Sequence, residues 1–257
     1  MTRSQQNASK YVYGVVRARR GSRQRLRGLN DEPVKVVAHD GIGALASDVP
    51  DGPLEAGRDE LMAHSRVLER ALEKGVVLPM RFGMVMPTEE AIRQDLLGPY
   101  SDELEAQLDE MEGKVELNIK AIYEEQAILR EVLVESPEIA ALRRSLEGKP
   151  EDATYYERIR LGEQVATELA RMRDADTARA MDLLEPLAES ARAEEGGPIS
   201  AFNLSFLVRR ARQEEFTRSV RALRDETRER IELRYIGPLP PYSFADTGLE
   251  PGRSQWV

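Results

Sequence analysis

The sequence lacks cysteine altogether and has only two histidines and one tryptophan among its 257 residues. Without cysteine there are no disulfides, thiolate metal sites, iron–sulfur clusters or cysteine nucleophiles, and a reducing cytoplasm is the simplest location. Long apolar runs are also missing, since the longest uncharged stretches, 196–208 and 235–245, are shorter than the roughly 18 residues of a membrane-spanning helix. The apolar segment 11–16 is too short for a signal-peptide core, and arginines follow it. No membrane partner is therefore expected.

Charge is abundant but unevenly placed. The chain has 46 Asp and Glu against 37 Lys and Arg, which gives a formal net charge of −9. Such an excess argues against nucleic-acid binding over the surface as a whole. Residues 1–40 are the exception, because nine basic and three acidic side chains give them a net charge of +6. With 41% hydrophobic residues, the composition is that of a globular chain with room for two domains.

The N-terminal part predicts a mixed α+β domain over residues 8–112. Short runs rich in valine and tyrosine are typical of strands. Apolar residues at helical spacing, followed by Gly75 where a helix C-cap is expected, predict an amphipathic helix. The expected strands are 10–16, 34–39, 41–49, 76–79 and 81–86, and helices are expected at 58–74, from 87, and at 104–111.

The rest of the chain predicts a modified ferredoxin-like sheet with a long helical insertion over residues 113–244, followed by an extended tail at 245–257. Alternating apolar and polar residues indicate half-buried strands, and the first of these places Glu116 and Asn118 on the solvent side. Helical spacing from 152 to 193 predicts one long helix, broken or kinked near Pro186. Strands alternating with helices in this way fit one sheet covered on one face. The other expected strands are 200–208 and 231–235, and the other expected helices are 122–134, 137–148 and 213–230.

No group of residues has the pattern of a catalytic, cofactor-binding or metal site. His64 has only Glu60 as a possible fellow ligand at helix spacing, whereas zinc needs three or four ligands, and His39 is equally isolated. Phosphate-loop, nucleophile-elbow and zinc-protease motifs are absent. The acidic run 102–112 is expected to be the solvated face of a helix. We therefore expect no enzyme, no cofactor and no bound metal.

Six arginines between residues 17 and 27 form the only charge cluster that suggests binding. Its first members, Arg17, Arg19 and Arg20, are candidate contacts for an acidic protein partner, and a solubilising loop is the alternative. Nucleic-acid binding would need exposed stacking aromatics beside the cations. Tyr11 and Tyr13 are nearby, but they share their strand face with a valine, which favours a core. No nucleic-acid partner is expected.

Four segments, in their order and spacing, resemble a known family over nearly the whole chain. The most specific is Tyr-Ile-Gly-Pro-Leu-Pro-Pro-Tyr-Ser-Phe at 235–244. The others are the strand at 11–16, His64 with the downstream run Val-Leu-Pro-Met-Arg-Phe-Gly at 77–83, and Tyr-Glu-Arg at 156–158 leading into 161–165. Together they resemble the gas vesicle protein F/L family, accessory proteins of buoyant gas-filled organelles in prokaryotes.

The resemblance implies a two-domain fold whose C-terminal part is similar to a modified ferredoxin fold. It also implies a non-enzymatic role in gas vesicle assembly or nucleation, at the gas vesicle in the cytoplasm. The implied partners are the main gas vesicle shell protein and other gas vesicle accessory proteins, and no catalytic residues are implied. The alternative is a small-metabolite-binding enzyme or sensor on a ferredoxin-like sheet, which requires a concave pocket with converging polar groups.

The proline- and aromatic-rich segment 238–244 has two interpretations. It can end the last strand and hold the chain against the fold through its aromatic residues, which is the favoured interpretation. Alternatively, it forms an extended docking surface for a partner. The candidate contacts in the segment are Pro240, Pro241, Tyr242 and Phe244.

Overall fold

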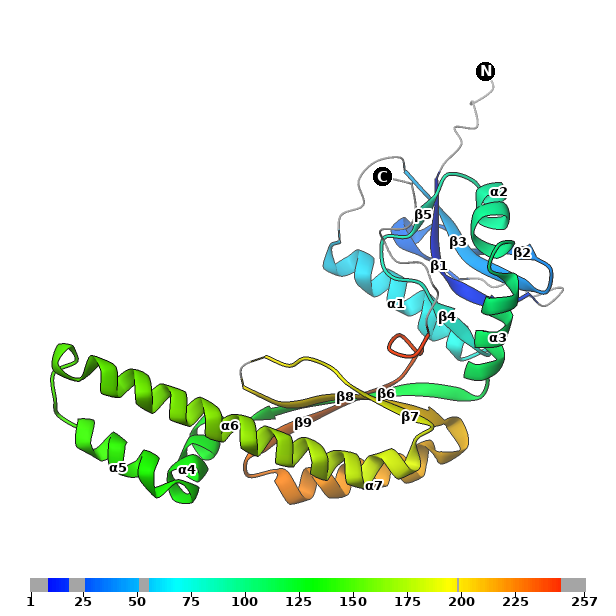
Figure 1. Ribbon diagram of the computed structural model, residues 1–257. Helices are drawn as coiled ribbons and strands as arrows, with labels where there is room; N and C mark the ends of the chain where they lie inside the picture. The colour runs from blue at the N-terminus through cyan, green and yellow to red at the C-terminus, as the bar shows by residue number, and fades with distance from the viewer. Residues whose placement is uncertain (1–8, 19–25, 51–55, 198, 246–257) are drawn as a thin grey trace. The chain divides into compact units, whose positions relative to one another are not determined.

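The computed structural model describes residues 9–18, 26–50, 56–197 and 199–245, and these form two compact units. The first unit contains the described residues up to Glu116 and those from Pro238 onwards, and the second contains Leu117–Gly237. The chain leaves the first unit inside strand β6 (Lys114–Tyr123) and returns inside β9 (Ile231–Leu239) (Figure 1). Residues 238–244 therefore lie in the first unit, whereas the sequence placed them in the C-terminal domain. Only the first residue of the expected tail 245–257 is described.

The first unit is built around strand β1 (Ser9–Arg17), which is buried along most of its length. It pairs antiparallel with β3 along its whole length and with β4 and β5 along shorter stretches, while β2 extends the sheet beyond β3. A Cβ atom at Gly14 would lie 2.6 Å from the carbonyl oxygen of Leu78, so the close pairing of β1 with β4 requires glycine there. The other strands are β2 (Lys35–His39), β3 (Ile42–Val49), β4 (Val77–Pro79) and β5 (Val85–Met86).

The helices of the first unit are amphipathic and bury one face each. In α1 (Arg58–Leu72) the buried side chains recur at intervals of three and four residues, as expected of a helix that packs on a core. Helix α3 (Ser101–Met111) buries three apolar residues in the same way. The predicted helix at 58–74 is confirmed, with its end close to Gly75. Between these helices lie α2 (Glu89–Ala91) and a π-helical segment (Ile92–Leu97), and a short 3-10 turn occupies Leu29–Asp31.

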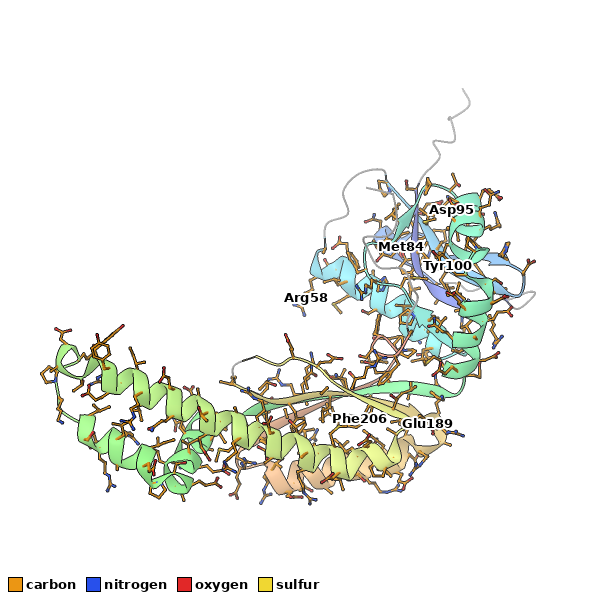
Figure 2. The ribbon with its side chains drawn as sticks, viewed as in Figure 1. Arg58, Met84, Asp95, Tyr100, Glu189 and Phe206 are labelled. Atoms are coloured by element: carbon orange, nitrogen blue, oxygen red, sulfur yellow. The ribbon has the colours of Figure 1, made fainter. Side chains whose placement is uncertain are left out.

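The second unit is a four-stranded sheet with the strand order β7-β8-β6-β9. In Figure 1 helices α6 and α7 lie along one face of this sheet, and Figure 2 labels Phe206 in β8. The Phe206 ring packs against Phe216 of α7 with centroids 5.1 Å apart, and both side chains are fully buried. The expected α+β class is therefore confirmed. The elements are α4 (Glu125–Glu135), α5 (Pro137–Leu146), α6 (Tyr155–Leu184), β7 (Ser190–Ala193), β8 (Ser200–Arg209) and α7 (Gln213–Thr227), with 3-10 turns at Asp152–Thr154, Glu185–Leu187 and Arg210–Arg212.

Strand β7 corrects the expectation of a helix that continues to residue 193. Helix α6 ends at Leu184, and a 3-10 turn containing Pro186 follows, so the predicted break at this proline is confirmed. The chain then pairs antiparallel with β8, from Ser190 opposite Leu207 onwards. The local sequence Ser-Ala-Arg-Ala has no strand preference, so the pairing with β8 decides its conformation.

Strand β6 corrects the expected alternation. Glu116 and Asn118 were predicted on the solvent side, yet they are only 3% and 6% exposed. The Asn118 side-chain amide donates to Asn203 Oδ1 at 3.2 Å and to Ser205 Oγ at 3.0 Å. Polar side chains can be buried on a sheet when neighbouring strands supply hydrogen-bond partners. Two smaller corrections are that β6 continues to Tyr123, which delays the helix expected from 122, and that only Val85–Met86 of the strand expected at 81–86 forms.

Candidate interaction surfaces

Arg17 is the only one of the three predicted arginine contacts that the structure describes, because Arg19 and Arg20 lie outside the described residues. It is the last residue of β1, and its guanidinium forms an ion pair with Asp109 of α3. Its Nε atom also lies 3.9 Å from a carboxylate oxygen of Glu112. An acidic partner would have to compete with both carboxylates for Arg17. The structure therefore gives this side chain an internal role in joining β1 to α3.

The C-terminal segment is mostly buried against the first unit. Pro240 and Pro241 are buried, and Phe244 is only 8% exposed. Tyr242 is 41% exposed and hydrogen-bonds to Ser65 of α1. Three of the four residues predicted to contact a partner are therefore largely inaccessible, and Tyr242 is the one that stays available.

Glu116 of β6 fixes this segment, although the sequence placed it on a solvated face. Its carboxylate accepts hydrogen bonds from the backbone N–H of Ser243 at 2.7 Å and from the Ser243 hydroxyl at 2.8 Å. Both donors lie more than a hundred positions further along the chain, so alternation within β6 carried no signal for the contact. The carboxylate is nine-tenths buried or more and is satisfied by these bonds.

Replacing Glu116 with alanine should release the C-terminal segment. We expect the free energy of unfolding to fall by about 2 kcal/mol, because two hydrogen bonds to a charged acceptor are lost. Proteolysis after residue 237, followed by mass spectrometry, should become faster, and urea unfolding gives the stability. Glu110→Ala, which removes an exposed carboxylate from α3, serves as the control. Unchanged cleavage in the Glu116 variant would show that the carboxylate does not hold the segment.

A buried aromatic cluster holds the only histidine of α1. The Oη atom of Tyr11 lies 2.9 Å from His64 Nδ1 and accepts a hydrogen bond from the backbone N–H of Gly83. The ring of Tyr13 stacks on His64, and Phe82 meets the same imidazole edge to face. Burial lowers the pKa of His64 to about 4, although the backbone of Met80 opposes the shift. His64 is therefore a neutral core residue at physiological pH.

A second polar network joins four elements of the second unit. Arg230, just before β9, forms a two-point ion pair with Asp176 of α6 at 2.7 and 3.0 Å. Its Nε atom donates to Glu131 of α4 at 2.7 Å, and its guanidinium lies over the ring of Tyr123 in β6. The Tyr123 hydroxyl donates to Asp176 at 2.6 Å. Burial and the Asp176 carboxylate raise the pKa of Tyr123, so its hydroxyl stays protonated and continues to donate. The sequence analysis did not single out any of these residues.

The helical arm, formed by α4, α5 and the N-terminal half of α6, has little interior and exposes apolar side chains. Tyr156 and Val134 are 82% and 80% exposed, the two highest values among large apolar residues that the structure describes. Tyr155 and Tyr156 meet edge to face, and Ile159 follows one turn later. We call Tyr155, Tyr156 and Ile159 the arm-tip cluster. It brings three exposed apolar side chains together in the second unit, and part of it lies in a segment that carries the family resemblance.

The first unit has an open cleft of about 550 Å³ beside α1. Its lining includes Arg27, Asp31, Asp59 and Arg66, all of them exposed to solvent. Metabolite sites usually enclose the ligand between apolar walls with a few converging polar groups. Nothing in this cleft favours the metabolite-binding alternative. Within the described ranges, no three His, Cys, Asp or Glu side chains are grouped to hold a metal ion, and no helix is long and apolar enough to cross a membrane.

Comparison with known proteins places this fold in one structural class. The crystal structure of the gas vesicle protein GvpF from Anabaena sp. PCC7120 matches with a TM-score of 0.81 and 26% identity, over 93% of this chain and 98% of that one. The GvpF structure from Microcystis aeruginosa matches with a TM-score of 0.77 and 24% identity, over 93% and 99%. The fold is thus that of gas vesicle proteins of known structure.

Sequence comparison gives the family itself. The model for "Gas vesicle synthesis protein GvpL/GvpF" matches residues 9–246. Gas vesicle protein F from Streptomyces sp. (strain CB03234) is 33% identical over 93% of this chain and 100% of its own length. Gas vesicle protein L1 from Halobacterium salinarum is 28% identical over 92% and 90%. The chain belongs to the GvpL/GvpF family of gas vesicle proteins, and the resemblance found in its sequence is confirmed.

Proposed function

We propose that this chain is a non-enzymatic accessory protein that acts at the gas vesicle, where it binds the main shell protein and other accessory proteins during assembly. The observation that carries the proposal is the family match over residues 9–246, which spans both units. The matched range includes the buried aromatic cluster, the helical arm and the C-terminal segment. The proposed role therefore belongs to the whole chain and not to one module.

The second unit, in this proposal, is a modified ferredoxin-like module. Its chain order is β6, three helices, β7, β8, α7 and β9. This is the β-α-β-β-α-β pattern with the first helical connection enlarged into the arm. The strand order β7-β8-β6-β9 places the first and third strands of the pattern at the centre of the sheet.

The physical basis is the solubility of the shell subunit. A shell that excludes water and holds gas presents an apolar surface, so its subunit tends to aggregate before assembly. A carrier with exposed apolar side chains can cover that surface, and a net charge of −9 keeps the complex dispersed. In the second unit the arm-tip cluster supplies such side chains on a helix with many charged residues. We infer that this cluster contacts the shell subunit.

Co-expression with the shell protein tests this role. The variant Tyr155→Gln/Tyr156→Gln/Ile159→Gln should lower the soluble fraction of the shell protein about two- to threefold, because exposed apolar contact area is lost while the fold is kept. The control is Leu61→Gln/Met62→Gln, which replaces similarly exposed apolar residues of α1 in the first unit. An equal loss in both variants would contradict the arm-tip site. If the unaltered chain leaves shell solubility unchanged, and its deletion leaves a producing strain buoyant, the proposed role itself fails.

A further inference from the structure

The stretch around α7 has a small excess of positive charge, in contrast with the chain as a whole. Residues 209–234 contain nine arginines, six acidic residues and no lysine, a net charge of +3 in a chain of net charge −9. Several of these arginines are paired with carboxylates, among them those at 209, 212, 230 and 234. No carboxylate of the described residues lies within 4.0 Å of the guanidinium groups at 218, 221, 224 and 228. These four charges are therefore free for an external partner.

Two of these arginines, Arg221 and Arg224, lie on one side of α7, and Arg228 directly after its last residue continues the helical backbone conformation. The three lie four, seven and eleven residues after Thr217, and residues at this spacing share a helix face. The Oγ1 atom of Thr217 lies 3.1 Å from the hydroxyl oxygen of Tyr235 in β9. The three arginines thus lie on the side of the helix that faces β9, and we call them the arginine stripe.

The opposite side of α7 is occupied by α6. Glu226 of α7 and Arg179 of α6 form an ion pair of 3.1 Å between the two helices. The residues between these two sides, Phe216, Val220 and Leu223, are buried against the sheet. The arginine stripe is therefore on the outer flank of the helix layer.

Strand β9 provides an open sheet edge next to this flank. It is the last strand in the order β7-β8-β6-β9 and has β6 as its neighbour on one side, while no other strand among the described residues pairs with it. Glu232, Arg234 and Ile236 are exposed. The edge offers backbone groups over residues 231–237, up to Pro238, which has no N–H to donate. Unpaired edges of this kind accept an added strand.

We propose that the arginine stripe and the outer edge of β9 bind an extended acidic segment of a partner protein as an added strand. The strand edge supplies backbone hydrogen bonds, and the arginines select a segment with carboxylates on one face. Arg221 and Arg228 are separated by about 10 Å along the helix axis, at 1.5 Å per residue. Alternate side chains of an extended strand repeat every ~6.6–7 Å, so two or three successive carboxylates face the stripe. The guanidinium fork suits such carboxylates in geometry as well as in charge.

The same surface is a poor match for nucleic acid. Asp225 and Glu229 lie among the arginines, and Glu232 is exposed on the adjacent strand, so a continuous phosphate chain would meet negative charge at intervals. Single-stranded nucleic acid also needs aromatic side chains free for stacking. The nearest one, Tyr235, is hydrogen-bonded to Thr217 and only partly exposed. The observations favour a protein partner.

Fluorescence anisotropy with the full chain and a labelled decapeptide of alternating glutamate and threonine tests the proposal. We expect saturable binding at low salt, weakened about tenfold in Arg221→Gln/Arg224→Gln/Arg228→Gln, since three charge pairs are lost. The matched control is Arg218→Gln, which removes an unpaired arginine from the same helix on the side directly away from the sheet, and it should change the affinity less than twofold. Circular dichroism confirms that all variants are folded.

Backbone pairing is tested with two further peptides, one N-methylated at every glutamate and one at every threonine. Successive N–H groups of a strand point to opposite edges, so one methylated peptide should lose binding and the other should keep it. Equal binding by both would show attraction by charge alone and would overturn the added strand. No saturable binding, equal binding by the triple variant, or tighter binding of a ten-nucleotide oligothymidine would each overturn the acidic-segment site.

Discussion

Replacing Arg230 with alanine should lower the free energy of unfolding by about 3 kcal/mol, because the carboxylates of Asp176 and Glu131 then lose their shared cation. Arg230 joins the start of β9 to α4 and α6, and its guanidinium also covers the Tyr123 ring. Asp176 is only 14% exposed, so water cannot fully replace the lost ion pair. The loss should appear in urea unfolding as a lower midpoint. Since the network holds the base of the helical arm, amide exchange in α4 should also become faster.

The control for this prediction is Arg179→Ala on α6. Arg179 and Glu226 form an ion pair of similar length, but both side chains are half exposed, at 56% and 50%. Solvent screens such a pair, so we expect a much smaller loss of stability than in Arg230→Ala. If Arg230→Ala costs no more than Arg179→Ala, the network around Tyr123 does not hold the arm. A partial recovery in Arg230→Met/Asp176→Leu would confirm that the cost comes from the unpaired carboxylate.

Acidification from pH 7 to pH 4 should destabilise the protein by about 3 kcal/mol through His64 alone, at 1.36 kcal/mol for each pKa unit of difference. His64 is 4% exposed, and burial lowers its pKa to about 4, below the value of about 6.5 for an unfolded chain. Between these two values the unfolded state binds a proton that the folded state does not. Stability from this residue is therefore complete above pH 6.5 and is lost as the pH falls towards 4.

Urea unfolding at several pH values between 7.5 and 4 measures this effect against the variant His64→Gln. Glutamine does not titrate and can still hydrogen-bond to Tyr11. All other titratable groups are shared by both proteins, so a difference between their pH dependences comes from His64. The stability difference between the two should shrink steadily as the pH falls below 6.5. Parallel curves across the whole range would mean that His64 is already protonated or solvated in the folded state.

The C-terminal segment shows why sequence patterns predicted only some of the contacts within this chain. Its prolines and aromatics were recognised as a unit, and the favoured interpretation, that the aromatics hold the chain against the fold, agrees with the burial of Phe244. The sequence did not reveal the partner of the segment. That partner, Glu116, lies on a strand whose alternation marks it as solvent-exposed, and only a contact across the fold buries it.

The arginines also show that the density of charge along the sequence does not reveal which side chains are available to a partner. The cluster at 17–27 is dense in the sequence, yet its first member, Arg17, is paired with two carboxylates of α3. The arginines of α7 are spread among acidic residues, and the net charge of that stretch gives little indication of a site. The hydrogen bond between Thr217 and Tyr235 shows which side of α7 faces β9, and it is this contact in the fold that places the arginines on the outer flank.

The sequence by itself determined the family, the α+β class, most helices and strands, and the break at Pro186, because these depend on local residue order and on periodicity along the chain. The tertiary structure decided that Ser190–Ala193 is a strand, that Glu116 is buried, that 238–244 lies in the first unit, and which arginines are unpaired. Each of these depends on a partner far away in the sequence. Hydrogen bonds and ion pairs between distant segments produce no repeating pattern of residue types in the sequence of either segment.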